Sequence, residues 1–160
     1  MTPYSYISIM GRKLGLISGG SILVTKEDKR EPEHIDKIRM LSFNHQFSRK
    51  ETSDGLSEYP FFFSKDDDRS TPLLTQAFAE EEIIECEITL YRESPSGTQQ
   101  KFFTFTLEGA VITSHNMESR PEFSGNGEKI IEHFGISYRS LSQIYHEGST
   151  RESFTPTIDL

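Results

Sequence analysis

The amino-acid sequence predicts a mainly β fold: a β-barrel of two packed antiparallel sheets with one short flanking α-helix at about residues 71–81. Three observations support this prediction. Apolar and polar residues alternate with a period of two in most segments. Only one segment shows the helical spacing of apolar residues, and turns containing Gly or Pro separate the alternating segments. From this pattern we expect about seven to nine strands in a single domain.

The first half of the chain contains three of the alternating segments. Residues 4–10 form the first, with Ile7 and Ile9 on one face. The second is predicted as one strand over residues 39–47, and one of its faces carries Leu41, Phe43, His45 and Phe47. The third opens at Pro60 with three successive phenylalanines, so it is apolar on both faces. Such a strand is expected to be covered by the helix or by another subunit.

The helical segment begins after Ser70. A hydroxyl residue before Pro72 is typical of a helix start, because the hydroxyl can cap a free N–H and Pro has no N–H to leave unpaired. The apolar residues that follow lie on one face of a helix, at Leu73, Leu74, Ala77 and Phe78. The acids of residues 66–68 come just before the helix, where negative charge favours the positive end of its dipole.

Four more alternating segments follow the helix, at residues 84–91, 101–108, 110–115 and 130–138. Residues 94–97 supply a turn, and residues 116–127 are predicted to be a loop from their composition. The residues after 148 show no apolar periodicity. We therefore divide the chain into one domain, residues 1–148, and a flexible C-terminal tail, residues 149–160.

Composition excludes several classes of protein. The 160 residues carry a formal charge of −8, from 25 acidic and 17 basic side chains, which argues against nucleic-acid binding. No apolar stretch approaches the roughly 18–20 residues that span a bilayer, so no membrane insertion is expected. The first ten residues alternate in polarity, so we expect a protein made in the cytoplasm and carrying no cleaved signal peptide. Because Cys86 is the single cysteine, an intrachain disulfide and a four-cysteine zinc site are excluded.

No pattern in the sequence is typical of an enzyme, a cofactor site or a metal site. The acids of residues 66–68 are not followed by the glycine-marked loop of a calcium site, and the five histidines lack ligand spacing. Cys86 and His45 fall on apolar strand faces, where packing is expected for both. Glu85 and Glu87 share a strand face, but no second acid site accompanies them as in a glycosidase. Nucleophile-elbow, P-loop and dinucleotide motifs are absent.

Several short strings in this chain nevertheless match one family together and in order. They are Tyr6-Ile7-Ser8-Ile9 with Gly11 and Gly15-Leu16-Ile17, Pro60-Phe61-Phe62-Phe63, Ser70-Thr71-Pro72-Leu73-Leu74 with Ala77, Ile88-Thr89-Leu90-Tyr91-Arg92, Phe102-Phe103-Thr104, Leu107-Glu108-Gly109-Ala110 and Ser137-Tyr138-Arg139. In these strings the chain resembles the haemolysin-coregulated protein (Hcp) family, the tube subunit of bacterial type VI secretion. The resemblance runs from about Tyr4 to His146. The chain departs from the family pattern in having no Trp and in the loop from Ser48 to Glu58.

The resemblance implies a homo-hexameric ring, and rings that stack into a tube. It further implies that the tube carries effectors outward, that it works with sheath and spike proteins, and that the protein is secreted through this apparatus. We name four candidate residues of the subunit interface. Phe62 supplies an outward aromatic, while Arg39, Lys65 and Arg92 are expected to pair with acids of a neighbouring subunit.

Two alternatives come from other classes of protein. A monomeric β-barrel that binds a small ligand in its interior has the same strand pattern. An effector enzyme would need a catalytic extension, and the residues after Ser149 are too few to form one. The subunit of a ring is the preferred interpretation, because a chain that completes its burial against neighbours can fold around a modest core of its own.

Overall fold

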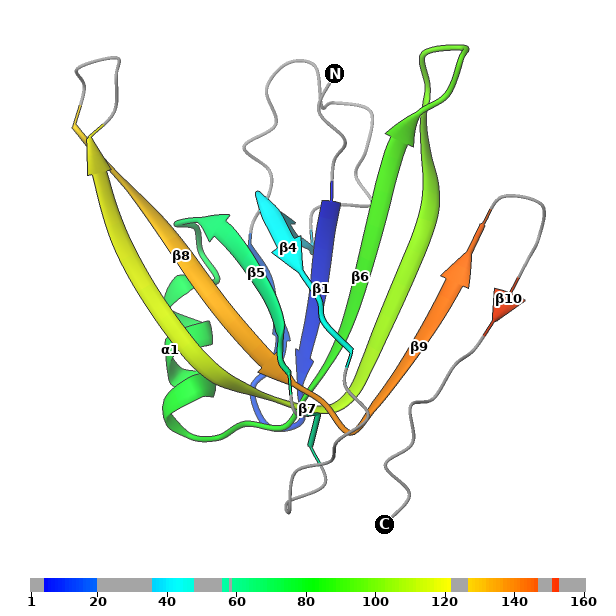
Figure 1. Cartoon of the computed structure of the whole chain (residues 1–160). Coiled ribbons are helices and arrows are strands. Elements are labelled where there is room, and N and C mark those ends of the chain that lie inside the picture. Colours follow the sequence, from blue (N-terminus) through cyan, green and yellow to red (C-terminus); the bar gives the residue numbers. More distant parts are fainter. Residues whose placement is uncertain are drawn as a thin grey trace.

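The structure is a computed structural model that describes residues 5–19, 36–47, 56–57, 59–121, 127–146 and 151–152. Within these ranges the chain forms ten strands and one helix (Figure 1). In chain order they are β1 (Ser5–Gly11), β2 (Gly15–Ile17), β3 (Ile38–Met40), β4 (Ser42–Asn44), β5 (Phe61–Asp66), α1 (Thr71–Ala79), β6 (Ile84–Glu93), β7 (Gln99–Pro121), β8 (Glu128–Ser137), β9 (Ser140–Tyr145) and β10 (Arg151–Glu152). The prediction of a mainly β fold with one short helix is confirmed.

Two antiparallel sheets share the long strand β7. The first half of β7 pairs with β6 and β9, and its second half pairs with β8. The hydrogen-bonded path runs in the order β2-β1-β6-β7-β8-β5-β4 and has open ends. On the other side β3 pairs with β1 and β4 pairs with β5, while the N–H of Leu41 between them donates to the carbonyl of Ser64 at 2.7 Å. The stretch from β3 to β4 therefore connects the two sheets into a barrel-like fold.

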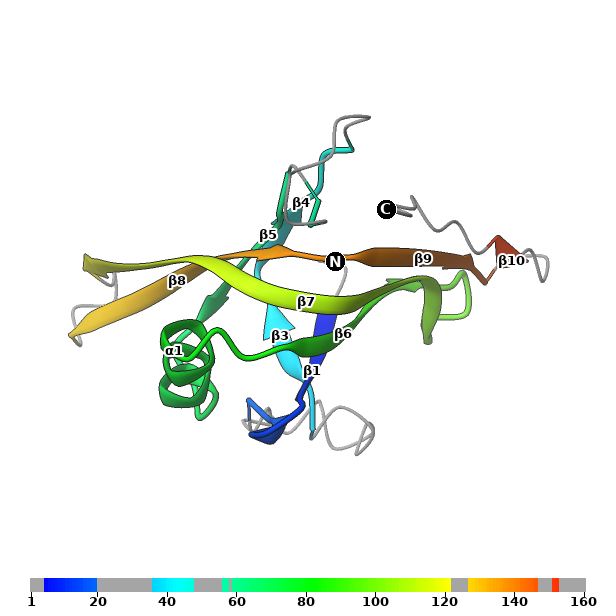
Figure 2. The same ribbon diagram turned by 90° about the horizontal axis from the view of Figure 1, so that it is seen from below.

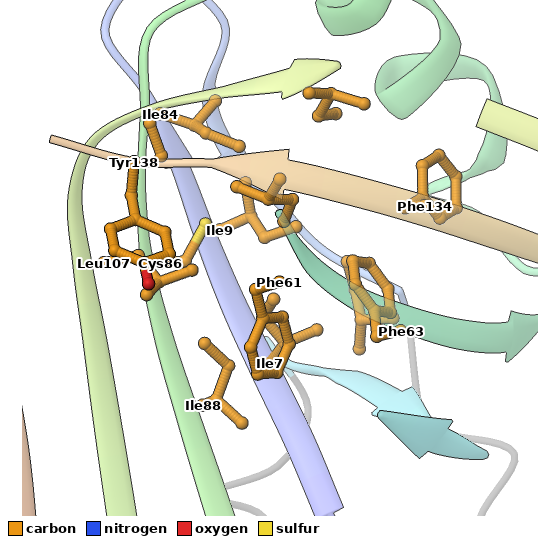
Figure 3. Close-up of a cluster of buried hydrophobic side chains, with 14 of the residues drawn as sticks. Ile7, Ile9, Phe61, Phe63, Ile84, Cys86, Ile88, Leu107, Phe134 and Tyr138 are labelled. Atoms are coloured by element: carbon orange, nitrogen blue, oxygen red, sulfur yellow. The ribbon is translucent and has the colours of Figure 1, made fainter. Parts of the chain in front are cut away.

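The period-two pattern buries one face of each central strand in a common core (Figure 3). In β5, Phe61 and Phe63 are buried while Phe62 between them is 44% exposed. The ring of Phe63 stacks on Phe134 of β8, with centroids 5.2 Å apart, because these residues lie directly opposite each other in the ladder. Cys86 is also buried in this core, which raises the pKa of its thiol, so the prediction of a packing role is confirmed.

Helix α1 packs against β7, on the side of that strand opposite to β4 (Figure 2). It buries Leu74 and Ala77, as the apolar spacing predicts. Ser70 is the N-cap residue, as predicted, but its hydroxyl makes no capping hydrogen bond. Instead, the carboxylate of Asp68 accepts two hydrogen bonds from Ser70, one from its hydroxyl and one from its N–H, the latter at 2.8 Å. The hydroxyl of Thr71, the first residue of α1, accepts a hydrogen bond from the N–H of Asp68 at 3.1 Å.

Two strand predictions need correction. Residues 39–47 do not form one strand, because the chain leaves the β1 sheet at Leu41 and joins the β5 sheet, and Leu41 is 45% exposed. Residues 116–121 are not loop, because β7 continues to Pro121 in register with β8. The ladder partner outweighs the polar composition there.

Most of the predicted C-terminal tail lies outside the described residues. Arg151 and Glu152 are described, and they form β10, antiparallel to Ile144 and Gln143 of β9. Among the described residues, no helix has the length and apolar character needed to cross a membrane.

Candidate functional site

The first candidate interface residue, Phe62, lies on the outer face of β5. It stands directly opposite Gly135 of β8, and its ring covers that glycine. A Cβ at Gly135 would lie 3.0 Å from the Phe62 ring and 2.4 Å from the hydroxyl of Ser114, so only glycine fits there without movement. Phe62 is thus partly exposed and also packs over Gly135 of its own sheet.

A hollow of about 370 Å³ lies beside Phe62, between β4, β5 and β8. It is lined by Ser42, Phe43, Asn44, Phe62, Phe63, Ser64, His133 and Phe134. All three residues of β4 are exposed, and among the described residues β4 is the last strand on this side of the path. Leu41, Phe43 and Phe47 are each between 37% and 50% exposed along the same stretch. We call these three residues together with Phe62 the aromatic edge, although Leu41 is aliphatic. Phe62 lies on the opposite face of the sheet from Phe43, because Phe43 is paired with Phe63 and Phe62 with Asn44. Such an edge is suited to contact with another chain.

The two predicted interface arginines are exposed, and they lie on strands other than β5. Arg39 lies on β3 between the buried Ile38 and Met40, so its side chain points to the outside. Arg92 lies near the end of β6, where its guanidinium is 4.7 Å from the centroid of the Phe102 ring and 3.4 Å from the hydroxyl of Tyr145. Arg39 and Arg92 thus lie on strands β3 and β6, whereas Phe62 lies on β5.

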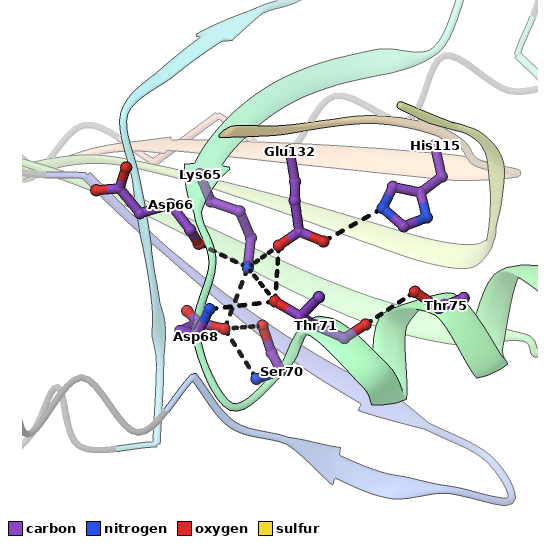
Figure 4. A network of polar contacts seen from close by, with 8 residues as sticks. All are labelled: Lys65, Asp66, Asp68, Ser70, Thr71, Thr75, His115 and Glu132. Carbon is purple, nitrogen blue, oxygen red and sulfur yellow. Dashed lines mark hydrogen bonds and ion pairs between the residues drawn. The ribbon is translucent and has the colours of Figure 1, made fainter. Parts of the chain in front are cut away.

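Lys65 differs from the other three candidates, because its side chain is fully buried (Figure 4). Its ammonium lies 2.5 Å from the carboxylate of Glu132 on β8 and 3.1 Å from that of Asp68. It also donates to the hydroxyl of Thr71 at 3.3 Å and to the carbonyl of Asp66 at 2.8 Å. The structure thus pairs Lys65 within its own chain, which corrects its assignment as a cation directed at a neighbour.

Glu132 completes this buried cluster. It has no exposed side-chain surface, and it accepts hydrogen bonds from Lys65, from the hydroxyl of Thr71 at 2.8 Å, and from His115 of β7 at 3.2 Å. The imidazole of His115 stacks on Phe134 with centroids 4.4 Å apart. We call Lys65, Asp68, Thr71, His115 and Glu132 the ion cluster. It joins three strands to the start of α1, and Lys65 and Glu132 at its centre have no exposed side-chain surface.

A second polar site lies where the described chain continues beyond β4. The Nε2 of His45 is 2.6 Å from the hydroxyl of Tyr138, and rings of Phe47, Phe61 and Phe105 surround the imidazole at centroid distances of 4.3, 5.6 and 6.0 Å. Burial lowers the pKa of His45 to about 4 and raises the pKa of Tyr138 to about 12. Both groups are therefore neutral across the usual pH range.

Sequence reasoning missed the roles of Glu132, His115 and Tyr138. One signal was available, since Glu132 alternates in phase with Phe134 and Ile136, and Lys65 alternates in phase with the buried phenylalanines of β5. A charged residue at an inward position predicts a buried partner, but only the ladder register shows that Lys65 and Glu132 are directly opposite. In the described part of the chain, no group of three or more acidic, histidine or cysteine side chains could hold a metal ion.

Comparison with known proteins places this geometry in a context. A family model described as "Type VI secretion system effector, Hcp" matches residues 13–145. The "Major exported protein" of Pseudomonas aeruginosa is 29% identical, over 96% of this chain and 95% of that protein. The structure of the secreted protein Hcp3 from Pseudomonas aeruginosa is similar with a TM-score of 0.75 and 26% identity, over 96% of this chain and 98% of that chain. A crystal structure of an Hcp protein has a TM-score of 0.77 and 25% identity at the same coverages.

Proposed function

The chain belongs to the Hcp family and is a structural component of the type VI secretion system, and from this premise we propose that it is the subunit of six-membered rings that stack into a tube. The tube carries effectors outward and is itself exported with them. Sheath and spike proteins are its partners in this proposal. Its role is mechanical, and it performs no catalysis.

The observation that carries the ring proposal is the aromatic edge. Four large apolar side chains, Leu41, Phe43, Phe47 and Phe62, are between 37% and 50% exposed next to a terminal strand of the sheet. An apolar edge of this kind favours pairing with another chain. Among the described strands, the sheet path is also open at both ends. A head-to-tail contact between different edges of identical subunits closes into a ring when the rotation allows it.

Charge imposes a second condition on such a ring. Six copies at −8 each carry −48, so like-charged subunits must meet through local pairs of opposite charge. Arg39 and Arg92 are the two candidate cations that remain exposed, since Lys65 is buried. We propose that they lie opposite acids of the adjacent subunit. The mass of the assembly, measured from low to molar salt, should then fall as salt rises.

The decisive experiment images the purified full-length protein by negative stain and measures its mass by light scattering. Annular particles with the mass of six chains support the proposal. A monomer that persists at high concentration contradicts it and favours a ligand-binding barrel.

Two variants at the aromatic edge and one control test the position of the contact. Phe62→Asp should yield folded monomers, whereas Ile83→Asp, at an apolar residue of similar exposure just before β6, should still form rings. Because Phe62 also covers Gly135, Asn44→Lys, which leaves that contact intact, supplies a second test. Lysine on an edge strand hinders strand contacts without disturbing the core. Rings that survive in both edge variants would place the contact elsewhere.

A further inference from the structure

One residue, Tyr138, holds two distant parts of the chain at once. Its backbone N–H donates to the hydroxyl of Ser57 at 3.2 Å, and its carbonyl accepts the N–H of Ser57 at 2.9 Å. Its side-chain hydroxyl lies 2.6 Å from Nε2 of His45. Backbone groups hold Ser57, whereas a titratable ring holds His45. The two attachments therefore differ in their response to pH.

The surroundings of His45 suit the neutral imidazole alone. Rings from four parts of the chain face it: Phe47 on its own segment, Phe61 of β5, Phe105 of β7 and Tyr138 after β8. Among the described contacts of the imidazole, Tyr138 is the one titratable partner, and no carboxylate faces the ring. The Nδ1 atom is buried without a hydrogen-bond partner. A charged imidazole has a proton on both nitrogens, and the one on Nδ1 would have no acceptor in this position.

We propose that the His45–Tyr138 pair is an acid-released latch, which holds residues 45–47 against the barrel when His45 is neutral and frees them when it is protonated. The backbone ladder of β4 ends at Asn44. Residues 45–47 belong to no strand, so the ring of His45 is the described attachment of this stretch to Tyr138. Phe47 packs on that ring, with centroids 4.3 Å apart.

The direction of the effect follows from the cost of a buried charge. Burial lowers the pKa of His45 to about 4, below its ordinary 6.5. The released state therefore binds a proton more readily than the closed state. The latch is fully formed above pH 6.5, weakens as the pH falls toward 4, and weakens no further below that value.

The latch goes beyond the proposed function, because it is a property of the single folded chain. One consequence does rest on that function. Phe47 belongs to the aromatic edge, so its release in acid would weaken a ring that uses this edge. Rings that are lost at acid pH while the latch stays closed, or rings that persist while the latch opens, would show that the latch and the ring contact are independent.

The test is nuclear magnetic resonance of the full chain with ¹³C-labelled histidine. At pH 7 the His45 ring should show nuclear Overhauser contacts to the rings of Phe47 and Tyr138. As the pH falls to 4 these contacts should disappear in a one-proton transition with its midpoint between 4 and 6.5. The contact between His115 and Phe134, whose rings stack 4.4 Å apart, should persist and so serves as an internal control.

Two variants sharpen the test. Tyr138→Phe keeps the ring and removes the hydroxyl, so the closed state is weaker and the midpoint should move up by about half a pH unit or more. His133→Gln changes a histidine that makes no contact with the latch, and its midpoint should equal that of the unmodified protein. Contacts of His45 that survive its protonation would overturn the proposal. An ordinary pKa of 6.5 for His45 would overturn it as well, and both outcomes can be read in the unmodified protein alone.

Discussion

The ion cluster and the latch both hold a histidine next to aromatic rings, but they stabilise buried polarity by different means. In the ion cluster Glu132 has three hydrogen-bond partners, and two of these, Lys65 and Thr71, also contact each other. In the latch His45 has one hydrogen bond and a buried nitrogen without a partner. Several mutual contacts make a site rigid, whereas a single hydrogen bond leaves a site that one proton can open.

The position of each site in the fold follows the same division. The ion cluster joins β5, β7 and β8 to the start of α1, so it lies inside the framework. The latch lies beyond the end of β4, next to the aromatic edge. A structural subunit needs a fixed framework and an edge that can engage a partner, and the two sites correspond to these two needs.

The largest effect is expected when the ion cluster is broken. Lys65→Met leaves Glu132 buried without its ammonium partner, so the free energy of unfolding should fall by about 3–5 kcal/mol. Urea unfolding followed by circular dichroism measures this loss. The double variant Lys65→Met with Glu132→Leu removes both charges and should recover a large part of it. A single variant as stable as the parent would show that the pair contributes little.

Sequence patterns predicted the core well because alternation alone determines which face of a strand is inward. Ile7, Ile9, Phe61 and Phe63 are buried as expected. The ion cluster was not predicted, because its members meet through the register between β5 and β8 and through the docking of α1. The split of residues 39–47 into two strands also has no local signal, since Leu41 fits either arrangement until the second sheet is in place.

The second effect is a loss of stability in acid, and it comes from His45 of the latch. His45 has a lowered pKa of about 4 when folded, so its contribution is complete above pH 6.5 and is lost as the pH falls toward 4. Because its ring is partly accessible to solvent, the loss should be about 1–2 kcal/mol. His45→Phe should abolish this component of the dependence on pH. The measurement is urea unfolding at pH 7, 5.5 and 4, with His133→Gln as the matched control. Parallel curves for the parent and His45→Phe would contradict the assignment.

A third effect appears at alkaline pH. The pKa of Tyr138 is raised to about 12 from its ordinary 10. The contribution of the neutral phenol is therefore complete below pH 10 and is lost as the pH rises toward 12. Tyr138→Phe should lower the unfolding free energy by about 1 kcal/mol at pH 7 through the lost hydrogen bond, and it should remove this component of the alkaline loss. Phenolate absorbance during titration measures the pKa directly, and a midpoint at 10 would contradict a buried hydroxyl.

The smallest effect tests whether burial, and not charge alone, gives the ion cluster its strength. Lys129 of β8 lies 3.1 Å from the carboxylate of Asp66 on the adjacent strand β5, but both side chains are about two-fifths exposed. The Oδ1 atom of Asp66 is itself buried, but water and salt reach the exposed surface of both side chains, so Lys129→Met should cost less than about 1 kcal/mol and the cost should fall further in molar salt. The loss of unfolding free energy in Lys65→Met should be nearly independent of salt, because dissolved salt ions cannot reach the fully buried pair of Lys65 and Glu132. Equal losses in the two methionine variants would mean that the buried ammonium is no better held than the surface one.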